Sequence, residues 1–187
     1  MVHCRPPAST AVRVSPREFV TQRGCTEMTS PFEESPSPWI GPPLTEDMVR
    51  RAEETLGVRL PRSYVDLMYR QNGGVLKNSC HPTSFRTSWA ADHFQIDIIV
   101  GIGYEHGLDA ESAYLISEWE YPEVGVVLGV TPAAGHDTVM LDYSESGPDG
   151  EPAVVYVDED RIPRRIAGSF GEFMNGLVSC EAYEDED

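Results

Sequence analysis

The chain has 187 residues, of which 40% are hydrophobic, and this is enough for one domain with a buried core plus tails. Its formal charge at pH 7 is −17, and 29 of its 31 acidic residues follow residue 27. Such an acidic domain repels phosphates, so we expect no direct binding to nucleic acid and an attraction for basic partners instead.

The four cysteines, Cys4, Cys25, Cys80 and Cys180, lie far apart and form no C-x-x-C motif. Their spacing indicates neither a zinc site nor a dense disulfide framework, so a reducing compartment is the simpler assumption. No apolar stretch reaches the length of about 18 residues that a membrane helix needs, and the N-terminus lacks the apolar core of a secretory signal. We therefore expect a cytoplasmic protein without a membrane segment.

The first part of the chain is rich in Pro, Ser and Thr, so we expect a disordered leader over residues 1–38. Met28 lies inside it, and Met1 and Met28 are both candidate start sites. An ordered domain is expected over residues 39–180, followed by a frayed acidic tail over residues 181–187.

Two helices are predicted at the start of this domain. Thr45 is a suitable N-cap for the first helix, and Gly57 ends it. Pro61 fits the first turn of the second helix, which the Asn-Gly-Gly string at residues 72–74 stops.

The middle of the chain predicts a loop, two strands and one inserted helix. Residues 75–93 show no clear period and are expected to form a long loop. Alternation over residues 94–100 predicts a half-buried strand, and the apolar residues 124–130 predict a buried one. Between them, Asp109 is expected to cap a helix that ends at Glu118.

A hairpin is predicted over residues 135–160. Val139 and Leu141 share one face of its first strand, and the β-branched residues 153–157 form the second. The Gly-Pro-Asp-Gly string at residues 147–150 supplies the turn. Because many acidic residues flank these strands, we expect the hairpin to present a negatively charged face.

Ser169 and Glu172 have the spacing of a capping box and predict the start of the last helix. Phe170, Phe173 and Leu177 share one face of this helix. The order of elements predicts an α+β fold. Its centre is a mostly antiparallel sheet, accompanied by two N-terminal helices, one inserted helix and a C-terminal helix.

Motifs for catalysis or metal binding are weak. His81, Asp92 and His93 could meet at a metal, but histidines of a loop in water are the simpler interpretation. Residues 142–146 resemble the start of a calcium loop, yet Ala153 stands where the bidentate Glu belongs. The sequence shows neither a nucleophile elbow nor a dinucleotide fingerprint. We therefore predict a non-enzymatic protein with no cofactor and no metal.

Several short strings occur in a characteristic order. They are residues 54–64 (ETLGVRLPRSY), 71–74 (QNGG), 141–143 (LDY), 150–152 (GEP) and 169–173 (SFGEF). Together they resemble the SUKH superfamily over about residues 39–180, specifically the group named for a fungal cell-wall-synthesis regulator and found widely in bacteria. The loop over residues 77–93, with its Cys and His, departs from that pattern and is a candidate for setting partner choice.

The resemblance implies an α+β domain without catalytic residues. Its bacterial members resemble immunity proteins that bind a cognate toxin of a polymorphic or contact-dependent system, often a nuclease or a deaminase. The alternative is an intracellular regulatory or scaffold adaptor similar to the fungal cell-wall-synthesis regulators. A monomer or a weak dimer is expected in either case.

An acidic surface can occupy the basic surface of such a toxin as a mimic of phosphate. Eight acidic residues are candidates for contact with the partner: Glu118, Glu120, Glu123, Asp142, Glu145, Asp158, Glu159 and Asp160. An exposed aromatic residue among Trp39, Trp89, Trp119 and Tyr143 would be a candidate anchor.

Overall fold

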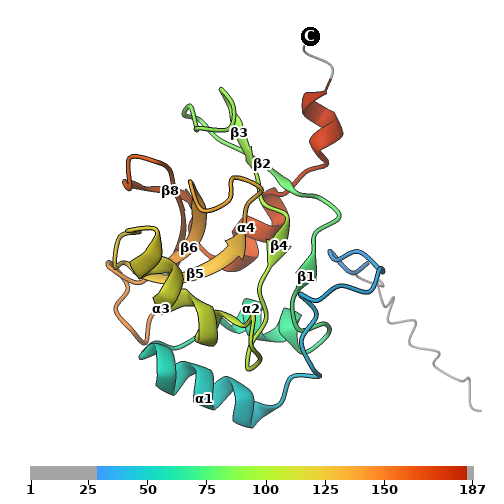
Figure 1. Cartoon of the computed structure of the whole chain (residues 1–187), viewed down its shortest axis with the longest axis vertical. Coiled ribbons are helices and arrows are strands. Elements are labelled where there is room, and N and C mark those ends of the chain that lie inside the picture. The colour runs from blue at the N-terminus through green and yellow to red at the C-terminus, as the bar shows by residue number, and fades with distance from the viewer. Residues whose placement is uncertain (1–28, 185–187) are drawn as a thin grey trace, which may run out of the picture.

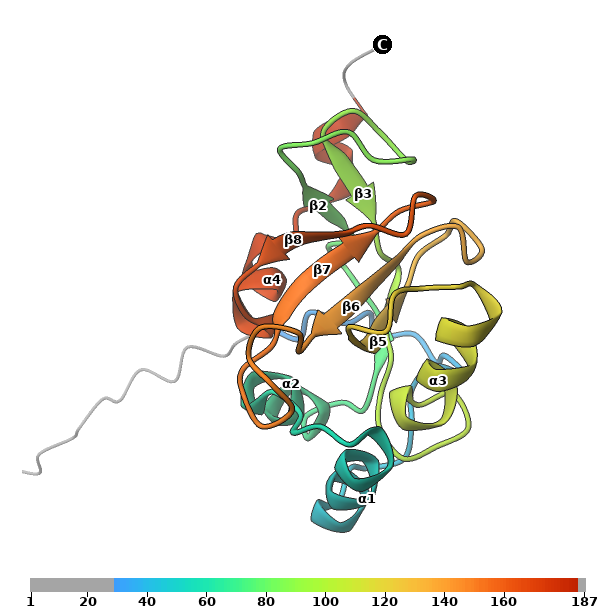
Figure 2. The same ribbon diagram turned by 90° about the vertical axis from the view of Figure 1, so that its left-hand side faces the viewer.

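The computed structural model describes residues 29–184 and shows an α+β fold, which confirms the predicted fold class (Figures 1 and 2). The helices are α1 (Glu46–Leu56), α2 (Arg62–Met68), α3 (Leu108–Glu118), α4 (Phe170–Gly176) and a 3₁₀ turn, η1 (Cys180–Tyr183). The strands are β1 (Gly74–Val75), β2 (Cys80–Pro82), β3 (His93–Gln95), β4 (Ile98–Ile99), β5 (Gly125–Val130), β6 (Thr138–Asp142), β7 (Ala153–Val157) and β8 (Pro163–Ala167). Within the described part of the chain, no helix is both long and apolar enough to cross a membrane.

The main sheet has six strands in the order β1-β4-β5-β6-β7-β8, and neighbouring strands pair antiparallel throughout. Strands β5 to β8 follow one another as a meander. A separate two-stranded sheet, β2-β3, branches off between β1 and β4 in the sequence and stands above the main sheet in Figure 2.

The central strands of the main sheet are buried on both faces. Val139 and Tyr156 are paired across β6 and β7 and join the larger core, into which α2 and α4 pack. Met140 and Val155 form the next pair and join a smaller core on the other face, where α3 lies (Figure 1). Because the side chains of a strand alternate between faces, both sets are removed from water.

The strand over residues 138–142 therefore alternates as predicted, but the prediction of a negatively charged face is wrong. Thr138 and Met140 are 2% and 0% exposed because α3 and the segment behind it cover that face. Asp142 is the last residue of β6, and the other acidic residues of the hairpin lie in the segments that precede and follow its strands.

Several helix ends are as predicted from the sequence. The Thr45 hydroxyl accepts a hydrogen bond from the Met48 amide, and Gly57 adopts the left-handed conformation after α1. The Ser169 hydroxyl likewise caps α4. The start of α3 differs, since Gly107 is its N-cap and the Asp109 carboxylate accepts a hydrogen bond from the Gly103 amide, 2.8 Å away.

The predicted long loop over residues 75–93 is wrong in part, because it contains the end of β1 and all of β2. The predicted strand over residues 94–100 is divided between two sheets, with β3 pairing to β2 and β4 pairing to β1 and β5. Strands of two or three residues are too short to show a period, so the sequence pattern missed them. β8 was missed as well, because it carries two consecutive arginines.

The domain begins before the boundary expected at residue 39. Phe32 is fully buried, and its backbone pairs with that of Leu76. Residues 29–38, expected in the leader, thus contribute to the core. The predictions for residues 1–28, including the choice between Met1 and Met28, and for residues 185–187 lie outside the described part of the chain.

Cys80 on β2 and Cys180 at the start of η1 form a disulfide between residues 100 positions apart in the sequence. The backbones of Cys80 and Val178 also exchange two hydrogen bonds, of 3.1 and 2.8 Å. The interpretation that the cysteines are distant from one another is therefore wrong for this pair, and cysteine spacing no longer argues for a reducing compartment.

His81 is buried rather than exposed in a loop, which corrects the interpretation of the histidines at this position. Its ring stacks between Phe94 and Phe173, with centroid distances of 5.5 and 5.3 Å. Burial lowers the pKa of His81 from its ordinary value of 6.5. His81 thus belongs to the packing between the small sheet and α4.

The disulfide provides a stability prediction. Replacing both Cys80 and Cys180 by Ala should lower the free energy of unfolding of the oxidised protein by about 2–4 kcal/mol, because the unfolded chain gains freedom. Urea denaturation measures the change. With a reductant present, the variant and the original protein should unfold at similar urea concentrations; a difference that persists would mean that the stabilisation does not come from the bond.

His81 provides a pH prediction. Because its pKa is lower in the folded protein, the unfolded chain binds more protons as the pH falls below 6.5. The free energy of unfolding should therefore decrease as the pH falls through this window. His81→Phe should remove this decrease, whereas His136→Phe, at an exposed position, should retain it. Urea titrations at a series of pH values test both, and an unchanged slope in His81→Phe would contradict the assignment.

Candidate functional site

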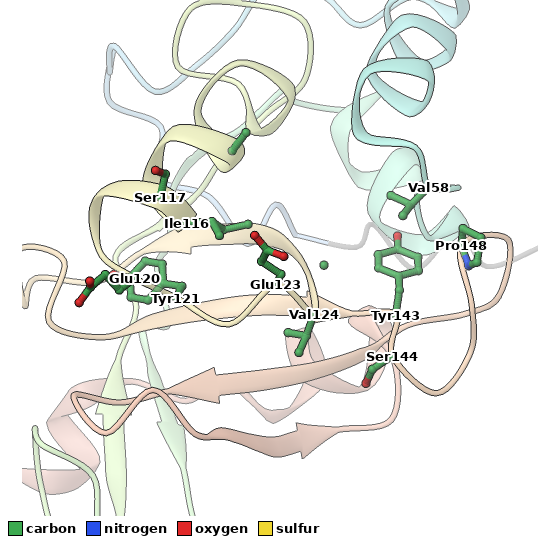
Figure 3. A pocket seen from close by; sticks show the side chains of 12 residues that line it. Val58, Ile116, Ser117, Glu120, Tyr121, Glu123, Val124, Tyr143, Ser144 and Pro148 are labelled. Atoms are coloured by element: carbon green, nitrogen blue, oxygen red, sulfur yellow. The ribbon is translucent and has the colours of Figure 1, made fainter.

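A groove of about 810 Å³ opens between α3, the start of β5 and the turn that follows β6 (Figure 3). Its labelled lining residues in Figure 3 are Val58, Ile116, Ser117, Glu120, Tyr121, Glu123, Val124, Tyr143, Ser144 and Pro148. These residues come from three separate stretches of the chain, so the groove exists only in the folded domain.

One side of the groove is the segment that leads from α3 to β5. It turns sharply at Glu120, a non-glycine residue with a positive φ of 55°. Such a conformation is sparsely populated and persists where the surroundings hold it. The next residue, Tyr121, keeps the backbone of this turn in place, because its hydroxyl donates to the carbonyls of Gly135 and Asp137 at 2.7 and 3.1 Å. The neighbouring Glu120 and Glu123 are left exposed at the groove.

The opposite side is tied to the link between α1 and α2. The Tyr143 hydroxyl donates to the Arg59 carbonyl at 2.7 Å, and the Arg59 amide donates to the Pro148 carbonyl at 2.7 Å. These two bonds hold the turn after β6 in place. In Figure 3, Glu123 lies between Ile116 and Tyr143, across the groove from this turn.

The lining of the groove is negatively charged. Its lining carries two carboxylates, Glu120 and Glu123, and none of its lining residues is a Lys, Arg or His. Burial raises the pKa of Tyr121 to about 12 and also raises that of Tyr143, so both phenols keep their protons near neutral pH. An apolar floor with a negative rim suits the binding of a basic surface.

The structure separates the eight predicted contact residues. Glu120 and Glu123 both line the groove, and Glu118 is exposed at the end of α3. Asp142 and Glu145 line a neighbouring hollow of about 320 Å³, where Glu145 lies 3.6 Å from Arg165.

The remaining three, Asp158, Glu159 and Asp160, follow β7 at the opposite end of the sheet. Asp158 is buried, and its carboxylate accepts hydrogen bonds from the amides of Ser88 and Glu159 at 2.9 and 2.8 Å. This burial contradicts its expected place on the surface. The residue instead anchors the loop that contains Ser88.

Asp142 and Asp160, which lie outside the groove, have local partners. The Asp142 carboxylate accepts a hydrogen bond of 2.8 Å from the Ser144 amide, which supports the turn interpretation over a calcium loop. Asp160 pairs with Arg164, and hydrogen bonds from that guanidinium lower the pKa of Asp160 to about 2. Because a local guanidinium already compensates the carboxylate of Asp160, that carboxylate attracts a basic partner less strongly than those of Glu120 and Glu123.

Sequence reasoning did not find the role of Tyr121 in the groove, because its neighbours form no motif. Among the candidate aromatic anchors, Trp89 is 42% exposed, whereas Tyr143 is buried. Within residues 29–184, no group of three or more His, Cys, Asp or Glu side chains is arranged to hold a metal ion.

Residues 46–174 match the protein-family model described as SMI1-KNR4 cell-wall. This match covers more than half of the chain and contains every residue that lines the groove. The chain belongs to this family. The resemblance to the SUKH superfamily is thereby confirmed. Phe32, Trp39 and Cys180 lie outside the matched range. No match was found among the curated proteins.

The wall of the groove provides a further stability prediction. Tyr143→Phe removes the bond to the Arg59 carbonyl and should lower the free energy of unfolding by about 1–2 kcal/mol. Tyr114→Phe is the matched control, because Tyr114 is 58% exposed and should tolerate the same change. Urea denaturation compares the two, and equal midpoints would show that the bond contributes nothing.

Proposed function

We propose that this domain is a non-enzymatic immunity protein that binds and neutralises a cognate toxin domain of a polymorphic or contact-dependent system. The observation that carries the proposal is the groove with Glu120 and Glu123 and no basic residue in its lining. Membership of the SMI1-KNR4 family supports it, because the bacterial branch of this family resembles immunity proteins.

The toxin is expected to be a nuclease or a deaminase, whose basic surface receives nucleic acid. Carboxylates on a rigid domain can take the place of phosphates on that surface. The formal charge of −17 attracts a basic partner over long range and raises the association rate. The apolar residues Val58, Ile116 and Val124 then supply surface that is buried on contact.

A second candidate function is a regulatory or scaffold adaptor for endogenous partners. The observation that favours it is the description of the matching family model, which refers to the cell wall. Both functions use a protein partner, and both are compatible with a monomer or weak dimer. They differ in whether the partner is a toxin.

The deciding experiment combines a pull-down with a growth test. The domain is tested for binding to the product of the neighbouring gene, and cells that express that product are tested for rescue by the domain. Binding with rescue supports immunity. A folded domain that neither binds nor rescues would exclude that gene product as a cognate toxin and favour the adaptor function.

The role of the groove is tested by reversing its charge. In the double variant Glu120→Arg/Glu123→Arg, the association rate with the basic partner should fall by about tenfold or more at low salt, because attraction becomes repulsion at the contact. Stopped-flow binding at several salt concentrations measures the rate. Rates for the original domain should also fall as salt rises.

The matched control is Glu46→Arg/Glu54→Arg on α1, which changes the net charge equally at exposed positions outside the groove lining. If both double variants slow association to the same extent, net charge alone sets the rate and the groove is not the contact site.

A further inference from the structure

A second cavity, of about 380 Å³, lies between α3 and the main sheet, on the other side of Tyr121 from the groove. Tyr121 is the residue that lines both. The aromatic and apolar walls of the second cavity include Trp39, His106, Leu115 and Trp119. A volume of this size and an apolar lining with a few polar groups are typical of ligand-binding cavities.

The aromatic walls are held in place by the backbone around them. The rings of Trp39 and His106 have centroids 5.3 Å apart. On the other wall, the Trp119 indole packs directly on Gly135, where a Cβ atom would lie 2.1 Å from the indole. Gly135 and the preceding Ala134 both have positive φ, of 91° and 51°. A strained alanine beside an obligatory glycine shows that the loop is fixed against the indole.

The cavity also carries negative charge. Asp137, which is 3% exposed, contributes to its lining. The partners of its carboxylate are the hydroxyl groups of Thr131, Tyr156 and Ser88. These hydrogen bonds come from hydroxyl groups and not from a basic side chain. Glu111 on α3 adds a second, half-buried carboxylate, and the lining residues of the cavity include neither Lys nor Arg.

We propose that this cavity receives an arginine side chain of the protein partner. Aromatic faces attract a guanidinium through cation–π contact, and carboxylates complement its charge. Arginine fits better than lysine because its planar, weakly hydrated head stacks on aromatic rings. The domain itself makes this contact twice, with Arg161 4.9 Å above Tyr121 and Arg164 5.7 Å above Phe85.

The inference rests on the proposed function, because the arginine belongs to the protein that the acidic groove binds. Since Tyr121 lines both hollows, one basic surface can cover the groove and insert a side chain into the cavity. The cavity would then select a partner by the position of one arginine, while the groove responds to its overall charge.

The test uses the full chain and a capped tripeptide, acetyl-Gly-Arg-Gly-amide, as a probe of the arginine side chain. Calorimetric titration should detect binding. The same peptide with citrulline, which keeps the shape and removes the charge, should bind at least about tenfold more weakly. A lysine peptide should also bind more weakly than the arginine peptide.

Two variants locate the binding. Glu111→Gln should reduce the affinity for the arginine peptide by about tenfold. Trp119→Leu should reduce this affinity further, because it removes one aromatic ring from the cavity. If Trp119→Leu does not fold, Glu111→Gln and the citrulline peptide still decide the matter. The matched control, Glu46→Gln, removes the same charge on α1 and should leave binding of the peptide unchanged.

Several outcomes would overturn the inference: no binding of the arginine peptide, equal binding of the citrulline peptide, or equal losses in Glu111→Gln and Glu46→Gln. If free L-arginine binds more tightly than the peptide, the occupant of the cavity is a small ligand and not a side chain of a protein partner. None of these outcomes affects rescue from a toxin, which tests the proposed function separately. Conversely, if the peptide binds but the domain rescues cells from no toxin, the arginine-binding cavity is supported and the immunity function is contradicted.

Discussion

The structure depends on the burial of both faces of its central strands. In β6 and β7, alternate side chains enter two different cores, with Val139 and Tyr156 on one side and Met140 and Val155 on the other. A sheet that is apolar on both faces must be covered twice, so α2 and α4 pack on one face and α3 on the other (Figures 1 and 2). Around β6 and β7, most charged residues consequently lie in the loops at the two ends of the strands.

The coverage by α3 leaves two hollows, and these are where the domain can meet a partner. The segment behind α3 lies between them, with Tyr121 reaching across to the carbonyls of Gly135 and Asp137. On one side, Glu120 and Glu123 give an open negative groove. On the other, Trp39 and Trp119 give an aromatic cavity with carboxylates. Both are fixed by backbone hydrogen bonds or close packing, so little ordering is needed when a partner binds.

The small sheet β2-β3 contacts the main sheet through Phe94, whose ring stacks on Tyr156 of β7, and it is also linked to the C-terminal segment. The disulfide from Cys80 to Cys180 and the stacking of His81 on Phe173 connect it to α4 and η1. A contact across 100 residues cannot be read from spacing, because proximity in the fold is unrelated to proximity in the sequence. The loop that was expected to be structureless is for this reason partly ordered, and Asp158 helps to hold it through Ser88.

The sequence by itself determined the local structure and the charge. Thr45, Gly57 and Ser169 set helix ends through hydrogen bonds and backbone preferences of a few neighbouring residues. The strand over residues 138–142 follows from its alternation, and the strand over residues 153–157 follows from its β-branched residues. Two of the eight candidate acids, Glu120 and Glu123, lie together at the groove. Only the tertiary structure decided which faces are buried, that Asp158 is enclosed, and that Val58, Tyr121 and Pro148 share one groove. These features depend on contacts between segments far apart in the chain, and the period of a single strand carries no information about what will cover it.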